Sequence, residues 1–277
     1  MIQNSAMLVD LNISMWTGRK MDKKVSEEID ASKNTHARAG NYHKKLLAGT
    51  QKLEQIQQLV ATISLWHYKY TMPWSDGGSR LLPMQVFFEY KPALADFERQ
   101  FNTMVEEFLA DYPTLVSAAA FQLSDLFSSD EYPDVDKLRG KFNFRYVFMP
   151  VPTAGDFRIE VGEAGRRELE EQYSKFYDTK LSGAMKDVWE RLHDCLTHMS
   201  DKLSGDNKKI FRDSLVDNAV ELCGVLSKLN VTQDAKLEDA RQKLERAMLG
   251  VSAVELRKHD DLRKDVKSKV DEILSMF

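Results

Sequence analysis

Apolar and polar residues alternate in two stretches of the chain, and each stretch predicts a β-strand. Between residues 6 and 16 every second side chain is apolar, and Leu8 is the one apolar residue among the polar positions. Between residues 141 and 148 four aromatic residues alternate with mainly polar ones. A proline-rich turn and a second alternating stretch, 157–161, follow, so this region predicts a β-hairpin to which the N-terminal strand is a candidate third member.

Most of the remaining chain has apolar residues three or four positions apart, the spacing typical of amphipathic helices. We expect one helical stretch over 22–70, with weak points or breaks at Gly40 and Gly49. Its first half is polar on nearly every side, so it needs a neighbouring element or a partner. Further helices are expected at 93–111 and 113–127, opened by Pro92 and Pro113, and at 163–203, 206–229, 232–249 and 252–276.

The last of these helices carries a narrow apolar stripe among closely spaced charges of both signs. Such a stripe is typical of an antiparallel helical bundle or of a short coiled-coil seam. We predict that its side chains form an interface, either inside the chain or between copies of it. The residues of the stripe are Leu256, Leu262, Val266, Val270 and Ile273.

Together these patterns predict a mainly α protein with a small β element, of the α+β class. Three consecutive regions are expected. Residues 1–91 hold the N-terminal strand, a basic helical arm and a turn rich in Trp, Gly and Pro; residues 92–162 hold helices and the β-hairpin; residues 163–277 hold the antiparallel helical bundle. A chain of 277 residues can bury a sizeable core.

Charge is distributed unevenly along the chain. The net charge is −4, but residues 1–91 hold 12 Lys and Arg against 8 Asp and Glu, whereas the rest holds 27 against 35. Halves of opposite charge are compatible with head-to-tail association between copies, or with binding of a polyanion by the basic half. For any single patch we favour the alternative that the charges only keep the surface hydrated.

The composition also indicates where the protein works. The sequence has no apolar run of the roughly 18 residues that a membrane span needs. The N-terminus lacks the basic and then apolar segments of a secretory signal. Cys195 and Cys223 lie within helical patterns, as buried thiols of a reducing compartment do. We therefore expect a cytoplasmic protein that does not contact a membrane.

The stretch 66–83 concentrates tryptophan, tyrosine, glycine and proline at the end of the basic arm. Basic side chains can follow a phosphate backbone while aromatic rings stack on unpaired bases. The alternative is a packed corner of the fold, which we favour for Trp66 and leave open for Tyr68 and Trp74. The candidate nucleic-acid-binding residues are Lys20, Lys23, Lys24, Arg38, Lys44, Lys45, Tyr68, Lys69, Trp74 and Arg80.

Catalytic chemistry has little support in the sequence. Potential metal ligands share one predicted helix, 163–203, but a di-iron bundle site needs a second Glu-x-x-His, which the chain lacks. A Cys–His nucleophile at Cys195 is conceivable, although a chain with two cysteines and six histidines offers that coincidence readily. No phosphate-binding loop occurs. We predict no catalytic residues, no metal site and no cofactor.

Two motifs carry a resemblance to a known family. Leu11–Arg19, LNISMWTGR, and Thr71–Pro83, TMPWSDGGSRLLP, resemble an uncharacterised family encoded by bacteriophages and prophages. The resemblance lies mainly in residues 8–90 and brings no catalytic residues with it. Genes of this family can lie near genes for AAA-type ATPases, so the resemblance implies a protein partner of that kind.

Two hypotheses for function follow. The first is a non-enzymatic, phage-encoded interaction or assembly protein that self-associates or docks on a protein partner such as an AAA-type ATPase. The alternative is a single-stranded nucleic-acid-binding protein of phage recombination or replication, which would use the basic arm and the aromatic turn. A hydrolase that uses the region around His193 is a remote third.

Overall fold

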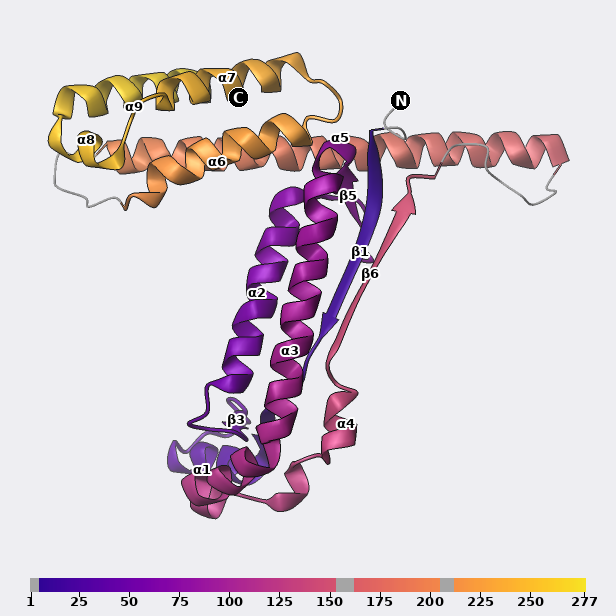
Figure 1. The fold of residues 1–277 in the computed structure, drawn as a ribbon, viewed down its shortest axis with the longest axis vertical. Coiled ribbons are helices and arrows are strands. Elements are labelled where there is room, and N and C mark those ends of the chain that lie inside the picture. Colours follow the sequence, from indigo (N-terminus) through magenta and orange to yellow (C-terminus); the bar gives the residue numbers. More distant parts are fainter. Residues whose placement is uncertain (1–4, 153–161, 205–211) are drawn as a thin grey trace. The chain divides into compact units, whose positions relative to one another are not determined.

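The described part of the chain in this computed structural model covers residues 5–152, 162–204 and 212–277. It is mainly helical, with one four-stranded antiparallel sheet and one separate two-stranded hairpin (Figure 1). The predicted α+β class is therefore confirmed. The strands are β1 (Ala6–Ser14), β2 (Arg19–Asp22), β3 (Tyr42–Lys45), β4 (Met72–Pro73), β5 (Arg80–Pro83) and β6 (Asn143–Pro150).

The helices differ widely in length, and the two longest are α3 and α5. Single 3₁₀ turns, η2 (Ser124–Leu126) and η3 (Ser129–Glu131), follow α3. The α-helices are α1 (Lys23–Ser32), α2 (Lys52–Tyr70), α3 (Met84–Leu123), α4 (Val135–Arg139), α5 (Gly162–Leu203), α6 (Ser214–Leu229), α7 (Ala235–Met248), α8 (Ala253–Lys258) and α9 (Asp260–Leu274).

The chain forms two compact units, and each is discontinuous in sequence. Unit 1 consists of Met1–Asp10, Trp66–Lys91 and Val147–Phe277, and unit 2 of Leu11–Leu65 and Pro92–Tyr146. The units therefore do not follow the three consecutive regions that we predicted. The elements β1, α2, α3 and β6 each contribute residues to both units.

The four-stranded sheet has the order β4-β5-β1-β6. Its register places Ala6 opposite Pro83 and Met72 opposite Leu81. The two predicted strands are confirmed, and the N-terminal strand does pair with the aromatic one. The predicted second strand of the hairpin, 157–161, lies outside the described residues. Both ends of the segment Thr71–Pro83 become strands, β4 and β5, which the sequence did not indicate.

The C-terminal helices of unit 1 form the predicted bundle. Helix α5 packs on α6 and α9, and α7 packs on α6 and α9. Their apolar stripes meet in one core, which includes Leu192, Leu196, Leu226, Leu244 and Val270. The last predicted helix is in fact two: α8 begins at a capping box made by Ser252 and Glu255, and α9 begins after a break at His259.

The core of unit 2 holds a cluster of aromatic rings among aliphatic side chains such as Ile56 and Ile63. Trp16 lies against Phe108 and makes an edge-to-face contact with Tyr112. Phe142 meets Phe108 in the same way. Such ring pairs add about 0.5–1.5 kcal/mol each to the stabilisation that burial gives. An ion pair between Lys52 and Asp111 joins α2 to α3.

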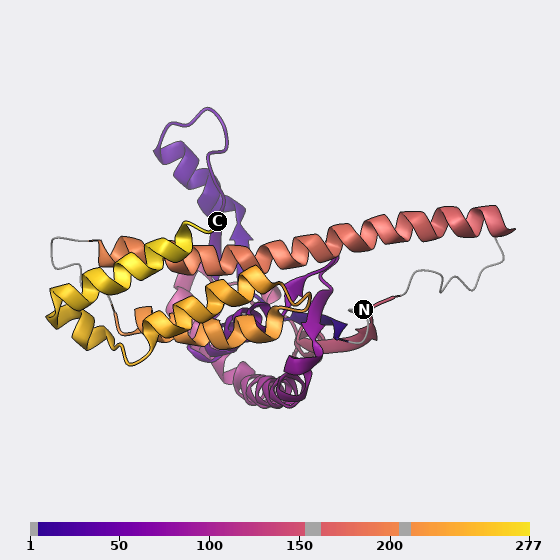
Figure 2. The same cartoon turned by 90° about the horizontal axis from the view of Figure 1, so that it is seen from above.

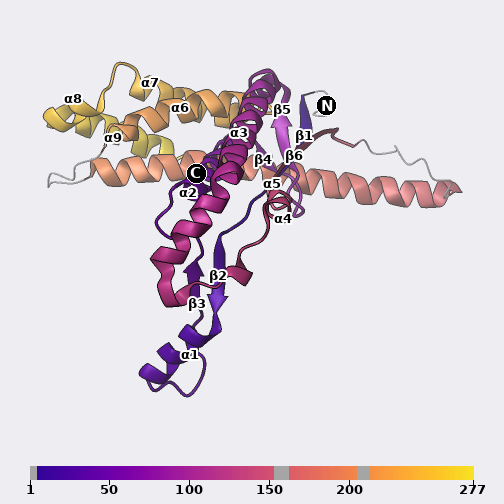
Figure 3. The ribbon, with the colours of Figure 1, turned by 60° about the horizontal axis from the view of Figure 1, so that its bottom comes forward.

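The predicted helical stretch over 22–70 is wrong in its middle. Helix α1 starts at the N-cap Asp22, whose side chain accepts a hydrogen bond from the backbone N–H of Val25, and it ends after ten residues. The chain then returns in β3, which pairs with β2 (Figure 3). The polar sequence of this stretch offers no continuous apolar face for a helix, and Gly49 adopts a left-handed conformation (φ +83°) before α2.

The two helices predicted to start at Pro92 and Pro113 are one helix, α3, with both prolines inside it. A proline leaves the carbonyl four residues earlier without its N–H donor. Both prolines are exposed. The carbonyl that Pro92 frees belongs to Phe88, which is exposed, so water can bond to it there. The prolines therefore do not mark helix starts here, and the apolar residues of Met84–Tyr90 belong to the same helix.

Candidate functional site

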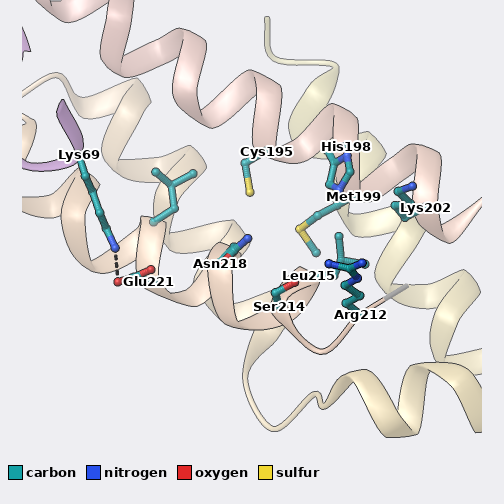
Figure 4. A pocket seen from close by; sticks show the side chains of 11 residues that line it. Lys69, Cys195, His198, Met199, Lys202, Arg212, Ser214, Leu215, Asn218 and Glu221 are labelled. Carbon is teal, nitrogen blue, oxygen red and sulfur yellow. Dashed lines mark ion pairs between the residues drawn. The ribbon is translucent and has the colours of Figure 1, made fainter. Parts of the chain in front are cut away.

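An open pocket of about 550 Å³ lies in unit 1 between α5 and α6, where the end of α2 joins its wall (Figure 4). Helix α5 presents side chains three and four positions apart, from Cys195 to Lys202, and α6 does the same from Ser214 to Leu222. Because such positions share one helical face, each helix turns one mixed polar and apolar face to the pocket.

The two ends of the pocket differ in charge (Figure 4). At one end Lys69 of α2 forms an ion pair with Glu221. At the other end lie His198, Lys202 and Arg212. Neither Lys202 nor Arg212 forms an ion pair within the part of the chain that the structure describes. The N-terminus of α6, at Ser214, adds the partial positive charge of a helix start. This end of the pocket is therefore electropositive.

The chemistry of Cys195 argues against a nucleophile. Burial raises the pKa of this thiol to about 11, so it stays protonated at neutral pH, and the thiolate is the reactive form. Among the described residues, no three His, Cys, Asp or Glu side chains gather as metal ligands would. Glu190, His193 and Asp194 are exposed, and the ring of His193 contacts Phe277. The side chains that line the pocket are charged, polar and apolar.

A second hollow, of about 400 Å³, shares Lys69 and Leu222 with the first pocket. Arg80 lies over the ring of Tyr68, 4.5 Å from its centroid, and Arg191 forms an ion pair of 2.6 Å with Asp187. Burial and then the charge of Arg191 lower the pKa of Arg80. Two guanidinium groups thus face a single carboxylate in this hollow.

The structure brings together three of the predicted nucleic-acid-binding residues, Tyr68, Lys69 and Arg80, in this second hollow. Trp74 is not available to a base, because it is 6% exposed and its ring packs edge-on against Tyr177. The prediction that Trp74 stacks on a ligand is therefore corrected: in this position the tryptophan is part of the core.

Lys44 also has a structural position. Its ammonium group lies 3.3 Å from Asp22 and 2.8 Å from Glu131, and it donates a hydrogen bond to the carbonyl of Leu126. Burial by itself would lower the pKa of Lys44, but the hydrogen bonds to Glu131 and Asp22 outweigh burial and raise it. This lysine ties β3 to the η2–η3 segment and is not free for a phosphate.

The other predicted basic residues are exposed in unit 2. Arg38 pairs with Glu27 and Lys45 with Glu54. Lys20, Lys23 and Lys24 lie at the junction of β2 and α1 and form no ion pair within the described residues. These lysines form a basic surface, but no aromatic residue lies next to them in the sequence.

The predicted interface stripe lies inside the bundle. Leu256, Val266, Val270 and Ile273 are buried in the core, and Leu262 packs against it half-buried. The reason is that α9 packs on both α5 and α7, which together cover its apolar face. An interface between copies could not use these side chains while the bundle is folded. The prediction is therefore corrected: the stripe forms an interface inside the chain and not between copies.

The structure indicates a different exposed element, which we call the α5 arm, residues 162–183. Within the described structure none of its side chains is buried. In Figure 2 it extends beyond α6, α7 and α9. Tyr173 donates a hydrogen bond to the carbonyl of Pro152, and Tyr177 contacts Trp74. Leu169 and Phe176 lie on the same side of the helix, and Phe176 is 49% exposed.

Sequence reasoning missed both the α6 side of the pocket and the α5 arm. In the sequence the arm looks like part of an ordinary bundle helix, since no signal marks the point beyond which other helices no longer pack against it.

The structure contains, within its described residues, no helix long and apolar enough to cross a lipid bilayer.

The fold defines the chain as an α+β protein with a helical bundle, a sheet and a separate hairpin. Comparison with models of protein families, with curated proteins and with solved structures gives no match. The resemblance to a phage-encoded family therefore stays a prediction.

Proposed function

We propose that this protein is a non-enzymatic assembly protein that self-associates through the α5 arm. The observation that carries the proposal is a long helical segment without a buried side chain. In proteins most helical stability comes from the packing of an apolar face against a neighbour. The arm has such a face, with Leu169, Tyr173 and Phe176, and a partner that covers it would supply the missing packing.

The charges of the arm favour a second copy of the chain as that partner. Its first ten residues, 162–171, carry four Glu against two Arg, whereas residues 172–181 carry two Lys against one Asp. Lys180 lies 3.4 Å from Asp76 of the same chain, so Lys175 is the basic residue that a second copy would meet first. Two arms that pair antiparallel about a two-fold axis place the acidic half of each against the basic half of the other. A two-fold interface requires self-complementarity of this kind.

Removal of the apolar side chains should break the association. In the double variant Leu169→Ser/Phe176→Ser, each copy loses two apolar contacts, and burial of one such side chain contributes about 1.5–3 kcal/mol. We expect the dimer dissociation constant to rise at least about 100-fold. Light scattering coupled to size exclusion, over a range of protein concentrations, measures this.

The matched control is Val220→Ser/Leu249→Ser, which removes two exposed apolar side chains from the bundle, outside the arm. It should leave the association unchanged, and circular dichroism should show both variants folded. A wild-type protein that is monomeric at every concentration would contradict the proposal.

An AAA-type ATPase partner, which the family resemblance implies, is a separate expectation that co-purification tests.

The gathering of Tyr68, Lys69 and Arg80 favours single-stranded nucleic-acid binding as a second candidate function. Arg80 lies over one face of the Tyr68 ring, but the residue is 53% exposed, so the rest of the ring is accessible to a base. Stacking contributes about 1–3 kcal/mol per base, so Tyr68→Ala should weaken binding of a labelled oligonucleotide about 5- to 150-fold in an anisotropy titration. Tyr42→Ala, at a partly exposed tyrosine of unit 2, is the control. Absence of binding at low salt would remove this candidate.

A further inference from the structure

We infer that the pocket between α5 and α6 binds a small anionic ligand that also carries an apolar group. This inference is independent of self-association, because it rests on the pocket and not on the α5 arm. The pocket volume of about 550 Å³ lies within the roughly 300–1,000 Å³ of typical small-molecule sites.

The anionic group is assigned to the end that holds Lys202 and Arg212. These two cations converge with the imidazole of His198 and with the N-terminus of α6 (Figure 4). Hydrogen bonds from charged donors to a carboxylate, sulfonate or phosphate are shorter and stronger than neutral ones. Glu221 does not oppose this end, because it lies at the other end of the pocket and is paired with Lys69.

The apolar group is assigned to the floor between the two ends. Met199 and Leu215 are buried beneath the pocket, and Leu222 is half-buried in its wall. The protonated thiol of Cys195 behaves as a small apolar group beside them. A free inorganic anion would leave this floor uncovered, whereas an aliphatic or aromatic chain would cover it and gain the free energy of apolar burial.

The polar residues of the wall fit the same ligand. Ser214 and Asn218 lie one turn apart on α6 along the side of the pocket. Their hydroxyl and amide groups can donate to an anion or accept from a hydroxyl. The geometry therefore points to amphiphilic carboxylates, sulfonates or phosphate monoesters, which share one chemistry.

Three probes test the inference. Anilinonaphthalene sulfonate is anionic and aromatic, N-phenyl-1-naphthylamine is its neutral relative, and decanoate is an aliphatic anion. In Lys202→Gln/Arg212→Gln we expect both anions to bind at least about tenfold more weakly, since one charged hydrogen bond contributes about 1.5–3 kcal/mol. The neutral probe should bind unchanged. Fluorescence titration serves the two dyes and calorimetry serves decanoate.

The matched control is Lys236→Gln/Lys258→Gln, which removes the same charge from exposed sites outside the pocket. Lys258 lies in the last turn of its helix, as Lys202 does, so the control also matches loss of a favourable helix-end charge. Anion binding should be unchanged in this control. Equal weakening in both double variants would show a general charge effect and overturn the assignment.

A second variant tests the position of the ligand. Asn218 is exposed on α6 and points into the pocket, so Asn218→Trp should fill the space without disturbing the core. We expect it to abolish binding of both dyes and of decanoate. Retention of binding in this variant, or competition by inorganic phosphate as effective as by decanoate, would overturn the inference, as would failure of every probe to bind.

Discussion

Replacement of Val270 by aspartate is expected to unfold the C-terminal bundle. Val270 is fully buried on α9, where that helix packs on α5 and α7. A carboxylate at this position would lose its hydration and gain no partner from the apolar residues of the core. The cost should exceed about 4 kcal/mol, which is a large part of the 5–15 kcal/mol that stabilises a typical domain. Circular dichroism and urea denaturation measure the loss.

The control is the same substitution at an exposed valine. Val220 lies on α6 and is 52% exposed, so Val220→Asp should change the stability by no more than about 0.5 kcal/mol. A milder change, Ile273→Val, should leave a folded protein that is about 1 kcal/mol less stable. If Val270→Asp remained folded and stable but dissociated an oligomer, the apolar stripe of α9 would lie between copies, and the packing described here would be wrong.

Much of the fold could be predicted because its apolar periodicity is strong. The alternation around Val9 and around Phe144 gave the two strands, and the stripe that ends at Ile273 gave the bundle. Periodicity is a local signal, however, and it does not show which elements meet. The pairing of β5 with β1 brings together residues more than sixty positions apart, which no local pattern encodes.

The predictions that failed did so where tertiary context outweighed a local rule. Pro92 reads as a helix start, but its exposed position lets α3 continue through it. The sequence of the polar stretch after α1 indicates a helix, because it does not show the ion pairs of Lys44 with Asp22 and Glu131. These ion pairs hold β3 in place.

The candidate site was harder to predict than the fold. The pocket depends on two helices whose contact depends on the whole bundle, and of its residues the sequence analysis singled out only Lys69 and Cys195. Trp74 shows the opposite error. An aromatic residue in a turn rich in Gly and Pro can serve as a binding surface or as a core residue, and only its surroundings decide.

Acidification is expected to destabilise the protein through His67. The imidazole is 5% exposed, and its Nδ1 shares a hydrogen bond of 2.6 Å with the hydroxyl of Tyr90. Burial and then the charge of Arg80 lower the pKa of His67 from 6.5 to about 4. The folded protein therefore excludes a proton that the unfolded chain binds once the pH falls below about 6.5.

The sign and size of the effect follow from this difference in pKa. Where the unfolded chain binds more protons, stability rises with pH, so the contribution of His67 is complete above pH 6.5 and is lost as the pH falls toward 4. Between pH 7.5 and pH 5 the free energy of unfolding should drop by about 2 kcal/mol from this group, at about 1.4 kcal/mol per pKa unit. Urea denaturation at several pH values measures the drop.

His67→Gln keeps a polar side chain near Tyr90 but cannot titrate, so this variant should lack most of the drop between pH 7.5 and pH 5, even if it is less stable throughout. His36→Gln removes an exposed histidine of unit 2 and should keep the drop. The two variants separate the buried imidazole from the carboxylates, which titrate mainly at lower pH. A pH dependence in His67→Gln as steep as in the wild type would show that His67 is not the buried, neutral group that its contacts imply.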